Sequence, residues 1–204
     1  MSEIRVTNVL GENGNSPVNF TKGINMSGIV TATSFVPSQG QLSHRNLIIN
    51  GAMNVAQRGT SSTSAQYQTV DRFKFTASGA DELPSQAQVD VASGTTPYTL
   101  GFRKAYKITN GNQTSGAGAS DNVLLDYRME SQDIASSGWN YKSASSFITL
   151  SFWVKSSVAQ NFKGWLQTTD GTAQNYPFST GSLSADTWTK VTKTIPGHAN
   201  LQFD

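Results

Sequence analysis

Acidic side chains are the groups of this chain most suited to acid–base chemistry, and their spacing argues against a glycosidase. Asp126 and Glu130 fall on the same side of an expected strand, four residues apart. At about 3.3 Å per residue, this spacing separates them by about 13 Å. Glycosidase carboxyl pairs lie about 5–9.5 Å apart. A partner carboxylate on another strand stays an open alternative, but no motif indicates one. We therefore expect a protein that is not an enzyme.

Other catalytic and metal-binding residue types are scarce. The chain has no cysteine, and its two histidines, His44 and His198, lack the spacing of metal ligands. The glycine-rich residues 116–118 lack the lysine and the helix of a phosphate-binding loop. The sequence therefore predicts neither a cofactor nor a bound metal.

Two tryptophans lie on the polar side of expected strands. In residues 147–155, Trp153 alternates with the apolar Phe152 and Val154. In residues 162–168, Trp165 alternates with apolar positions and stands between Lys163 and Gln167. One interpretation is that these rings cover sheet edges or lie beneath loops. The other is that they form an aromatic binding surface.

A glycan-binding surface is the chemistry that these outward residues suit best. Sugars present apolar C–H faces that match aromatic rings, and hydroxyl rims that match carboxylate, guanidinium and amide groups. The alternative is that residues 111–120 or a neighbouring chain cover this face. The predicted glycan-binding residues are Trp153, Trp165, Asp126, Arg128, Glu130, Lys163 and Gln167.

The composition excludes several other functions. Only 14% of the residues are charged and the net charge is +2, so the chain lacks the basic character of a nucleic-acid-binding protein. No apolar run is long enough to span a bilayer, and the first residues do not form a targeting segment. We expect no nucleic-acid partner and no membrane partner, with synthesis in a cytoplasm.

Short alternating segments from residue 47 onward predict an all-β domain. Glycine, asparagine, aspartate and serine clusters separate these segments, and residues 131–139 are the single stretch with helical character. Regular strand spacing of this kind predicts an antiparallel jelly-roll sandwich. The expected strands are residues 54–57, 69–76, 86–91, 100–109, 122–131, 146–155, 162–168 and 187–195. The expected core residues are Phe73, Phe75, Val123, Leu125, Tyr127, Ile148, Leu150, Phe152 and Val154.

The chain divides near residue 42. Residues 1–42 contain too few large apolar side chains for a core of their own, but several β-branched ones. They predict an extended arm for attachment and oligomerisation that adds strands to other chains. Its contact residues are expected to be Ile4, Val6, Ile29 and Phe35. Residues 43–204 form the predicted jelly-roll domain.

Several segments resemble phage proteins. Residues 46–60, followed by Tyr67 and residues 70–73, resemble the opening of carbohydrate-binding-module-like jelly rolls in phage tail fibres and other virion proteins. Residues 151–156 and 188–191 resemble later strands of the same domain.

The predicted arm carries a second resemblance. Residues 4–8 and 28–35 resemble the N-terminal segment of cyanophage structural proteins. Together the resemblances imply a non-enzymatic virion protein, a fibre or appendage, that is made in the host cytoplasm. They imply a homotrimer that attaches to a portal, tail or capsid and displays a jelly roll toward host surface polysaccharide. A free carbohydrate-binding module or a glycan-degrading enzyme is the alternative.

Two departures from the family pattern modify these expectations. Ala52 stands where related modules often have an acidic residue in a calcium-linked position, so we expect no structural calcium. Related domains also continue with further strands beyond the match to residues 201–204. The resemblance therefore implies either a jelly roll incomplete at its C-terminal end or an edge that a neighbouring chain supplies.

Overall fold

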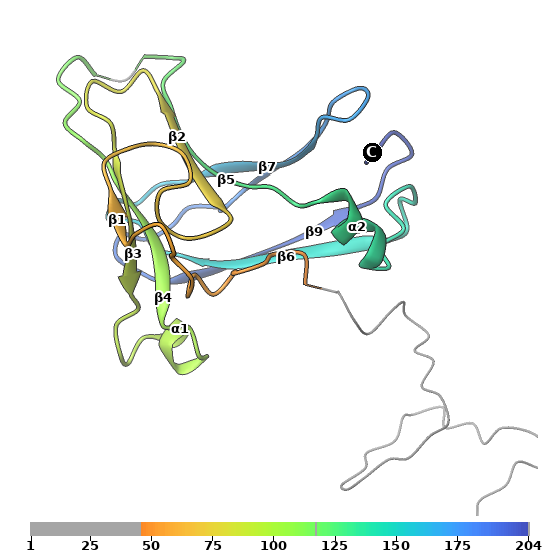
Figure 1. Cartoon of the computed structure of the whole chain (residues 1–204), viewed down its shortest axis with the longest axis horizontal. Helices are drawn as coiled ribbons and strands as arrows, with labels where there is room; N and C mark the ends of the chain where they lie inside the picture. Colours follow the sequence, from red (N-terminus) through yellow and green to blue (C-terminus); the bar gives the residue numbers. More distant parts are fainter. Residues whose placement is uncertain (1–45, 117, 204) are drawn as a thin grey trace, which may run out of the picture. The chain divides into compact units, whose positions relative to one another are not determined.

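The structure is a computed structural model that describes residues 46–116 and 118–203 (Figure 1). All of these residues belong to one compact unit. The predicted arm, residues 1–42 with Ile4, Val6, Ile29 and Phe35, and its boundary with the domain lie outside the described residues.

Antiparallel strands dominate this part of the chain, which confirms the all-β class. Every named strand pair is antiparallel. The sheets have the orders β1-β3-β4, β2-β5, β6-β9 and β7-β8. The elements are β1 (Ser61–Ser62), β2 (Phe73–Ser78), β3 (Ser85–Asp90), α1 (Thr96–Thr99), β4 (Lys104–Thr109), β5 (Asn122–Tyr127), α2 (Ser131–Ser136), β6 (Phe147–Val154), β7 (Lys163–Thr168), β8 (Gln174–Ser179) and β9 (Thr189–Pro196).

Most of the expected strands form, but β1 was not predicted, and the strands expected at residues 69–76 and 122–131 form only as β2 and β5. Three further differences stand out. The predicted strand at residues 100–109 forms only as β4, because the short helix α1, with Pro97 in its first turn, comes just before it. Strand β8 was not predicted, since it contains Pro177 and no clear alternation of apolar residues. Residues 54–57 form a loop instead of a strand. The helical stretch predicted at residues 131–139 forms as α2.

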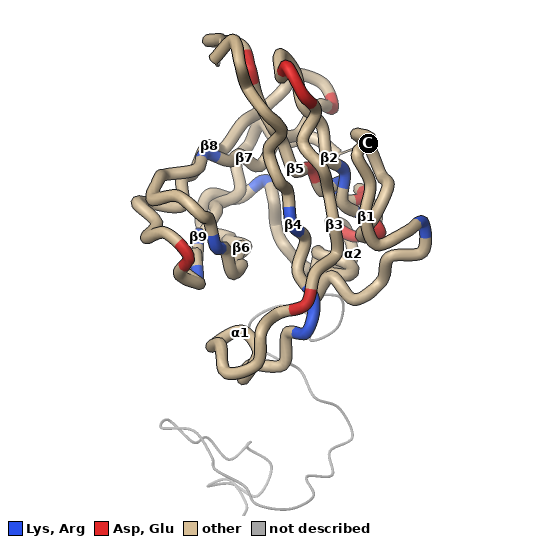
Figure 2. The backbone as a smooth tube through the Cα atoms, turned by 90° about the vertical axis from the view of Figure 1, so that its left-hand side faces the viewer, with Lys and Arg blue, Asp and Glu red and all other residues tan. Residues whose placement is uncertain are grey.

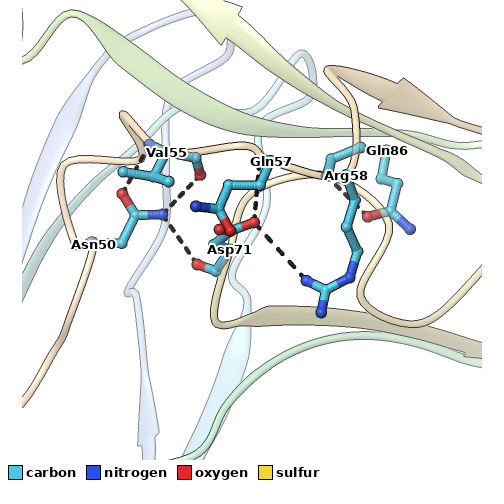
Figure 3. A network of polar contacts seen from close by, with 7 residues as sticks. Asn50, Val55, Gln57, Arg58, Asp71 and Gln86 are labelled. Atoms are coloured by element: carbon cyan, nitrogen blue, oxygen red, sulfur yellow. Dashed lines mark hydrogen bonds and ion pairs between the residues drawn. The ribbon is translucent and has the colours of Figure 1, made fainter.

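The loop at residues 54–57 is held by the side chain of Asn50 (Figure 3). The Asn50 amide accepts from the Val55 N–H (3.0 Å) and donates to the carbonyls of Val55 (2.9 Å) and Asp71 (3.0 Å). The Asp71 carboxylate accepts from the Gln57 N–H (3.1 Å) and lies 3.8 Å from the Arg58 guanidinium. Asn50 has a φ of 59°, a left-handed conformation that asparagine tolerates. Polar side chains of residues 46–60 and 70–73 therefore fix this loop.

The first half of the domain packs sheet β2–β5 against sheet β3–β4. Phe73 and Phe75 of β2 are buried, as predicted. The Phe73 ring centroid lies 5.1 Å from that of Tyr127 on β5 and 6.5 Å from that of Tyr106 on β4. Strands β3 and β4 run beside each other in Figure 2. Aromatic rings therefore join the facing sides of these two sheets.

Val123 and Leu125 of β5 were predicted to be buried, and this prediction is wrong. Their side chains are 40% and 46% exposed. Leu125 stands opposite the buried Phe75 in the strand register. However, Leu124 and Asp126, which were expected to face away, are less exposed than Val123 and Leu125. Strand β5 pairs only with β2 among the described residues, so its other edge is open. Tyr127, nearer the loops, is half-buried.

A buried polar network lies between these two sheets. Gln86 of β3 is fully buried, and its Oε1 accepts from the hydroxyls of Thr69 (3.0 Å) and Tyr106 (2.8 Å). Its Nε2 donates to the carbonyls of Ser64 (2.6 Å) and Gln66 (3.2 Å). Both lone pairs and both protons of the amide are therefore satisfied. Burial raises the pKa of Tyr106 to about 12.

The second half of the domain packs hairpin β7–β8 against sheet β6–β9. On the inner face of β6–β9, Phe152 stands opposite the buried Val191. The Phe152 ring centroid lies 6.5 Å from that of Phe178 on β8, and the Tyr176 hydroxyl donates to the carbonyl of Thr194 on β9 (3.4 Å). The predicted inward residues of β6 are half-buried: Ile148, Leu150, Phe152 and Val154.

A third apolar cluster joins the two ends of the described chain. Leu47, Ile134 of α2 and Trp139 are buried together, and Phe203 packs against them. The rings of Tyr141 and Phe203 meet edge to face, with centroids 4.8 Å apart. Residues far apart in sequence therefore close the domain around α2.

Candidate functional site

The outward face of hairpin β7–β8 carries the most coherent candidate site. Alternation turns Leu166 of β7 and Phe178 of β8 toward β6–β9, so the other side-chain row faces outward. The strand register places each residue of this row opposite a partner on the neighbouring strand. The outward pairs are Lys163 with Ser179, Trp165 with Pro177, and Gln167 with Asn175.

Four of these residues line a shallow, open depression of about 370 Å³, which we call the Trp165 groove. Its lining consists of Trp165, Gln167, Asn175 and Pro177. The Trp165 side chain is 47% exposed. The indole and the pyrrolidine ring offer apolar surface, while each of the two amides offers hydrogen-bond donors and acceptors. This combination suits a ligand that has both apolar faces and hydroxyl groups.

Local sequence fixes the hairpin that carries the groove. A Cβ atom at Gly164 would lie 2.6 Å from Cζ of Phe178, so only glycine leaves room for this ring. The Phe178 ring then reaches Phe152 of β6. Gly171, with a φ of 60°, supplies the left-handed residue of the turn between β7 and β8. The Thr168 hydroxyl donates to the Gln202 carbonyl (2.6 Å), which anchors the end of β7 next to this turn.

The two acidic residues predicted for this site lie on β5 or shortly after it, where ion pairs hold them. Asp126 of β5 stands opposite Lys74 of β2, with 3.3 Å between their charged atoms. The Glu130 carboxylate accepts from the Arg72 guanidinium at 2.7 Å. This hydrogen bond, with a second one from Gln132, lowers the pKa of Glu130. The structure therefore pairs both carboxylates with basic residues on or directly before β2.

Two further predicted residues also lie away from the groove. Arg128 is exposed and follows β5, where its carbonyl accepts from the Arg72 guanidinium (3.4 Å). Trp153 is half-buried on β6, opposite Lys190 of β9. Of the predicted set, the structure brings Lys163, Trp165 and Gln167 together on one face.

The sequence reasoning missed the β8 side of the groove. Asn175 and Pro177 lie on a strand that was not predicted. One signal was present, because Asp170-Gly171 is a turn dipeptide that follows an expected strand. Such a turn indicates a partner strand directly after it.

Residues 111–120 were the alternative cover for the predicted glycan-binding face. Part of this loop is hydrogen-bonded to the loop between β2 and β3. The Asp81 carboxylate accepts from the Ser115 N–H (2.7 Å) and the Thr114 hydroxyl (3.2 Å). The bonds from Ser115 are the main reason that the pKa of Asp81 is lowered. The Asn112 N–H donates to the Glu82 carboxylate (2.8 Å). These bonds tie residues 112–115 to the β2–β3 loop.

The described residues contain neither a metal-binding cluster nor a membrane-spanning helix. Within residues 46–116 and 118–203, no group of three or more histidine, aspartate or glutamate side chains is arranged to hold a metal ion. None of the helices in the same ranges is long and apolar enough to cross a membrane.

Comparison of the chain with models of protein families, with characterised proteins and with solved structures found no match. The assignment of a function therefore rests on the geometry of the groove and on the sequence resemblance.

Proposed function

We propose that this protein is a non-enzymatic structural protein of a phage virion, a fibre or appendage, whose domain binds glycans of the host surface. The observation that carries the glycan part is the Trp165 groove, with its exposed indole beside two amides. The virion part is supported by the resemblance of residues 46–60 and of the predicted arm to phage proteins.

The groove is built for contact with one or two sugar units. An indole face packs against the C–H groups of a sugar ring, and the amides of Gln167 and Asn175 exchange hydrogen bonds with its hydroxyls. The depression is open, so each site binds weakly. Several weak sites on one particle act together through avidity, which makes a homotrimer attached through residues 1–42 to a portal, tail or capsid the favoured assembly.

A jelly roll is the architecture that we propose for residues 43–204. Its support is the pairing of distant strands, β2 with β5 and β6 with β9, beside the local hairpins β3–β4 and β7–β8. Antiparallel sandwiches with such long connections are typical of Greek-key and jelly-roll folds.

The carboxylates favour a binding protein over a glycan-degrading enzyme. Lys74 and Arg72 neutralise Asp126 and Glu130, and the lowered pKa of Glu130 makes it a poor proton donor at neutral pH. A glycosidase needs one carboxyl group that stays protonated near neutral pH.

The proposal is tested with the full chain on an array of bacterial surface polysaccharides and neutral oligosaccharides. We expect at least tenfold weaker binding for Trp165→Ala and for the double variant Gln167→Ala/Asn175→Ala. Leu83→Ala is the matched control, because Leu83 is 49% exposed but lies in the loop between β2 and β3. Its binding should equal that of the unmodified protein.

Two results would contradict the proposal. The first is the absence of glycan binding by the unmodified protein. The second is equal binding by the Trp165→Ala variant, with its fold verified by thermal denaturation. A free carbohydrate-binding module is distinguished by its assembly, since it would bind the same glycans as a monomer in light scattering.

A further inference from the structure

The outward face of sheet β6–β9 carries two tryptophans and two lysines at one end. Trp153 of β6 stands directly opposite Lys190 of β9. Just beyond these ends of β6 and β9, the Lys155 Nζ atom lies 5.5 Å from the centroid of the Trp188 ring. Both lysines are exposed and both tryptophans are half-buried. We call these four residues the Trp–Lys face.

Strand alternation fixes the direction in which this face points. The other side of the sheet carries the buried Val191 and Ile195, opposite Phe152 and Ile148. Farther from the lysines, the outward side of the sheet carries exposed serine and threonine residues that stand opposite each other in pairs. These pairs are Ser151 with Thr192 and Thr149 with Thr194.

The lysines of this face have no acidic partner among the described residues. Neither β6 nor β9 contains an aspartate or glutamate. The nearest one in sequence is Asp186, whose N–H donates to the Ser156 carbonyl (2.7 Å). Its carboxylate forms no ion pair with Lys155 or Lys190, and neither lysine takes part in the ion pairs found between described residues. Within the described part of the chain, the face therefore presents two positive charges without an acidic partner, beside aromatic rings.

We infer that the Trp–Lys face binds an acidic polysaccharide, a sugar chain that carries carboxylate or sulfate groups. The ammonium groups of Lys155 and Lys190 pair with the anionic substituents, and the indole surface of Trp153 packs against the apolar side of a sugar ring. The Trp188 ring holds the Lys155 ammonium in place through a cation–π contact. A neutral glycan would leave both ammonium groups without a partner, so it fits this face less well.

The charge distribution favours an acidic polysaccharide over a nucleic acid. A protein that binds nucleic acid neutralises many phosphates with clustered lysine and arginine. This face has two lysines and no arginine, in a chain of net charge +2. The inference is independent of the Trp165 groove, which lies on the β7–β8 sheet.

The test uses the full-length protein and polymers of known charge. Polygalacturonate supplies carboxylates, dextran sulfate supplies sulfates, and dextran is the neutral reference; affinity electrophoresis gives the dissociation constants. We expect binding to at least one acidic polymer that weakens as NaCl rises, and weaker binding to dextran. Lys155→Gln/Lys190→Gln should lose at least tenfold in affinity for the acidic polymer.

The matched control removes the same charge elsewhere on the domain. Lys107 and Lys142 are exposed and form no ion pair among the described residues, and Lys142 also contacts an aromatic ring, that of Tyr141. Lys107→Gln/Lys142→Gln should change the affinity less than twofold. Trp165→Ala should keep its affinity for the acidic polymer, which separates this site from the groove.

Three outcomes would overturn the inference. The first is that the unmodified protein binds neither acidic polymer. The second is that the two lysine double variants lose equal affinity, because an equal loss indicates nonspecific charge attraction. The third is that a single-stranded oligonucleotide displaces the bound acidic polymer at a lower concentration than the free polymer does. This result would assign the face to nucleic acid.

Discussion

Replacing Gln86 by leucine tests the polar network between sheets β2–β5 and β3–β4. Leucine is close to glutamine in size but cannot form the four hydrogen bonds of the amide. The four groups that would lose the Gln86 amide as their hydrogen-bond partner differ in their access to water. Thr69 is 1% exposed, so its hydroxyl would stay buried without an acceptor. Ser64 and Gln66 are exposed residues, and Tyr106 is half-buried.

The expected loss of unfolding free energy follows from how exposed each of these groups is. A buried polar group without a partner costs about 1–3 kcal/mol. Thr69 contributes this full cost, and the partly accessible Ser64, Gln66 and Tyr106 groups together contribute about as much again. The added apolar burial of leucine offsets only part of the loss. We therefore expect Gln86→Leu to lower the free energy of unfolding by about 3 kcal/mol, or about 6–12 °C in melting temperature.

The assay is urea denaturation followed by tryptophan fluorescence. Gln88→Leu is the matched control, because Gln88 lies two residues along the same strand but makes a single side-chain bond, from Nε2 to the Met53 carbonyl (2.6 Å). Its expected cost is about 1 kcal/mol. A Gln86→Leu variant as stable as the unmodified protein, or no less stable than Gln88→Leu, would refute the reasoning.

Three further predictions concern pH, packing and assembly. The pKa of Tyr106 is raised from 10.0 to about 12 in the folded state, so folding favours its protonated form. This stabilisation, about 2 kcal/mol once the pKa shift is discounted for solvent screening of the half-buried ring, is complete below pH 10 and is lost as the pH rises through about 12. In urea titrations Tyr106→Phe should lose less stability than the unmodified protein over this range, and equal losses would contradict the argument. Gly164→Ala should destabilise the domain by about 1–3 kcal/mol, because its methyl group overlaps the Phe178 ring; Phe178→Leu in the same chain should restore part of the denaturation midpoint, and a neutral Gly164→Ala would contradict the packing. Deletion of residues 1–42 should leave a folded domain that no longer assembles, as measured by light scattering, and normal assembly would contradict the proposed role of the arm.

The sequence predicts which side chains share one face of a strand, but it does not predict which other elements cover that face. Alternation placed the inward and outward residues of β6 correctly, because each residue type follows its own face. The same rule placed Leu125 beside Phe75 but could not say that the outer end of this face stays exposed. Exposure depends on which other elements cover a face, and this is not a local property of the chain.

The candidate site was predictable to the same extent. Trp165 and Gln167 share one strand, so the alternation of that strand put them together. Their neighbours Asn175 and Pro177 depend on the pairing with β8, whose proline hides the strand pattern. Asp126 was assigned to the same surface as Trp165, but strand pairing sets it opposite Lys74. Contacts between distant segments decided each of these differences.

The cluster of Leu47, Ile134, Trp139 and Phe203 has a consequence for biosynthesis. Leu47 leaves the ribosome early, but its partner Phe203 is made more than a hundred and fifty residues later. The hairpin β7–β8, whose strands are joined by a short turn, can form as soon as it emerges. At the usual rate of about 5–20 residues per second, the first apolar residues wait for roughly ten seconds or more before the cluster can close. During this interval the nascent chain exposes apolar side chains and open strand edges, so its yield should depend on chaperones that bind it during translation.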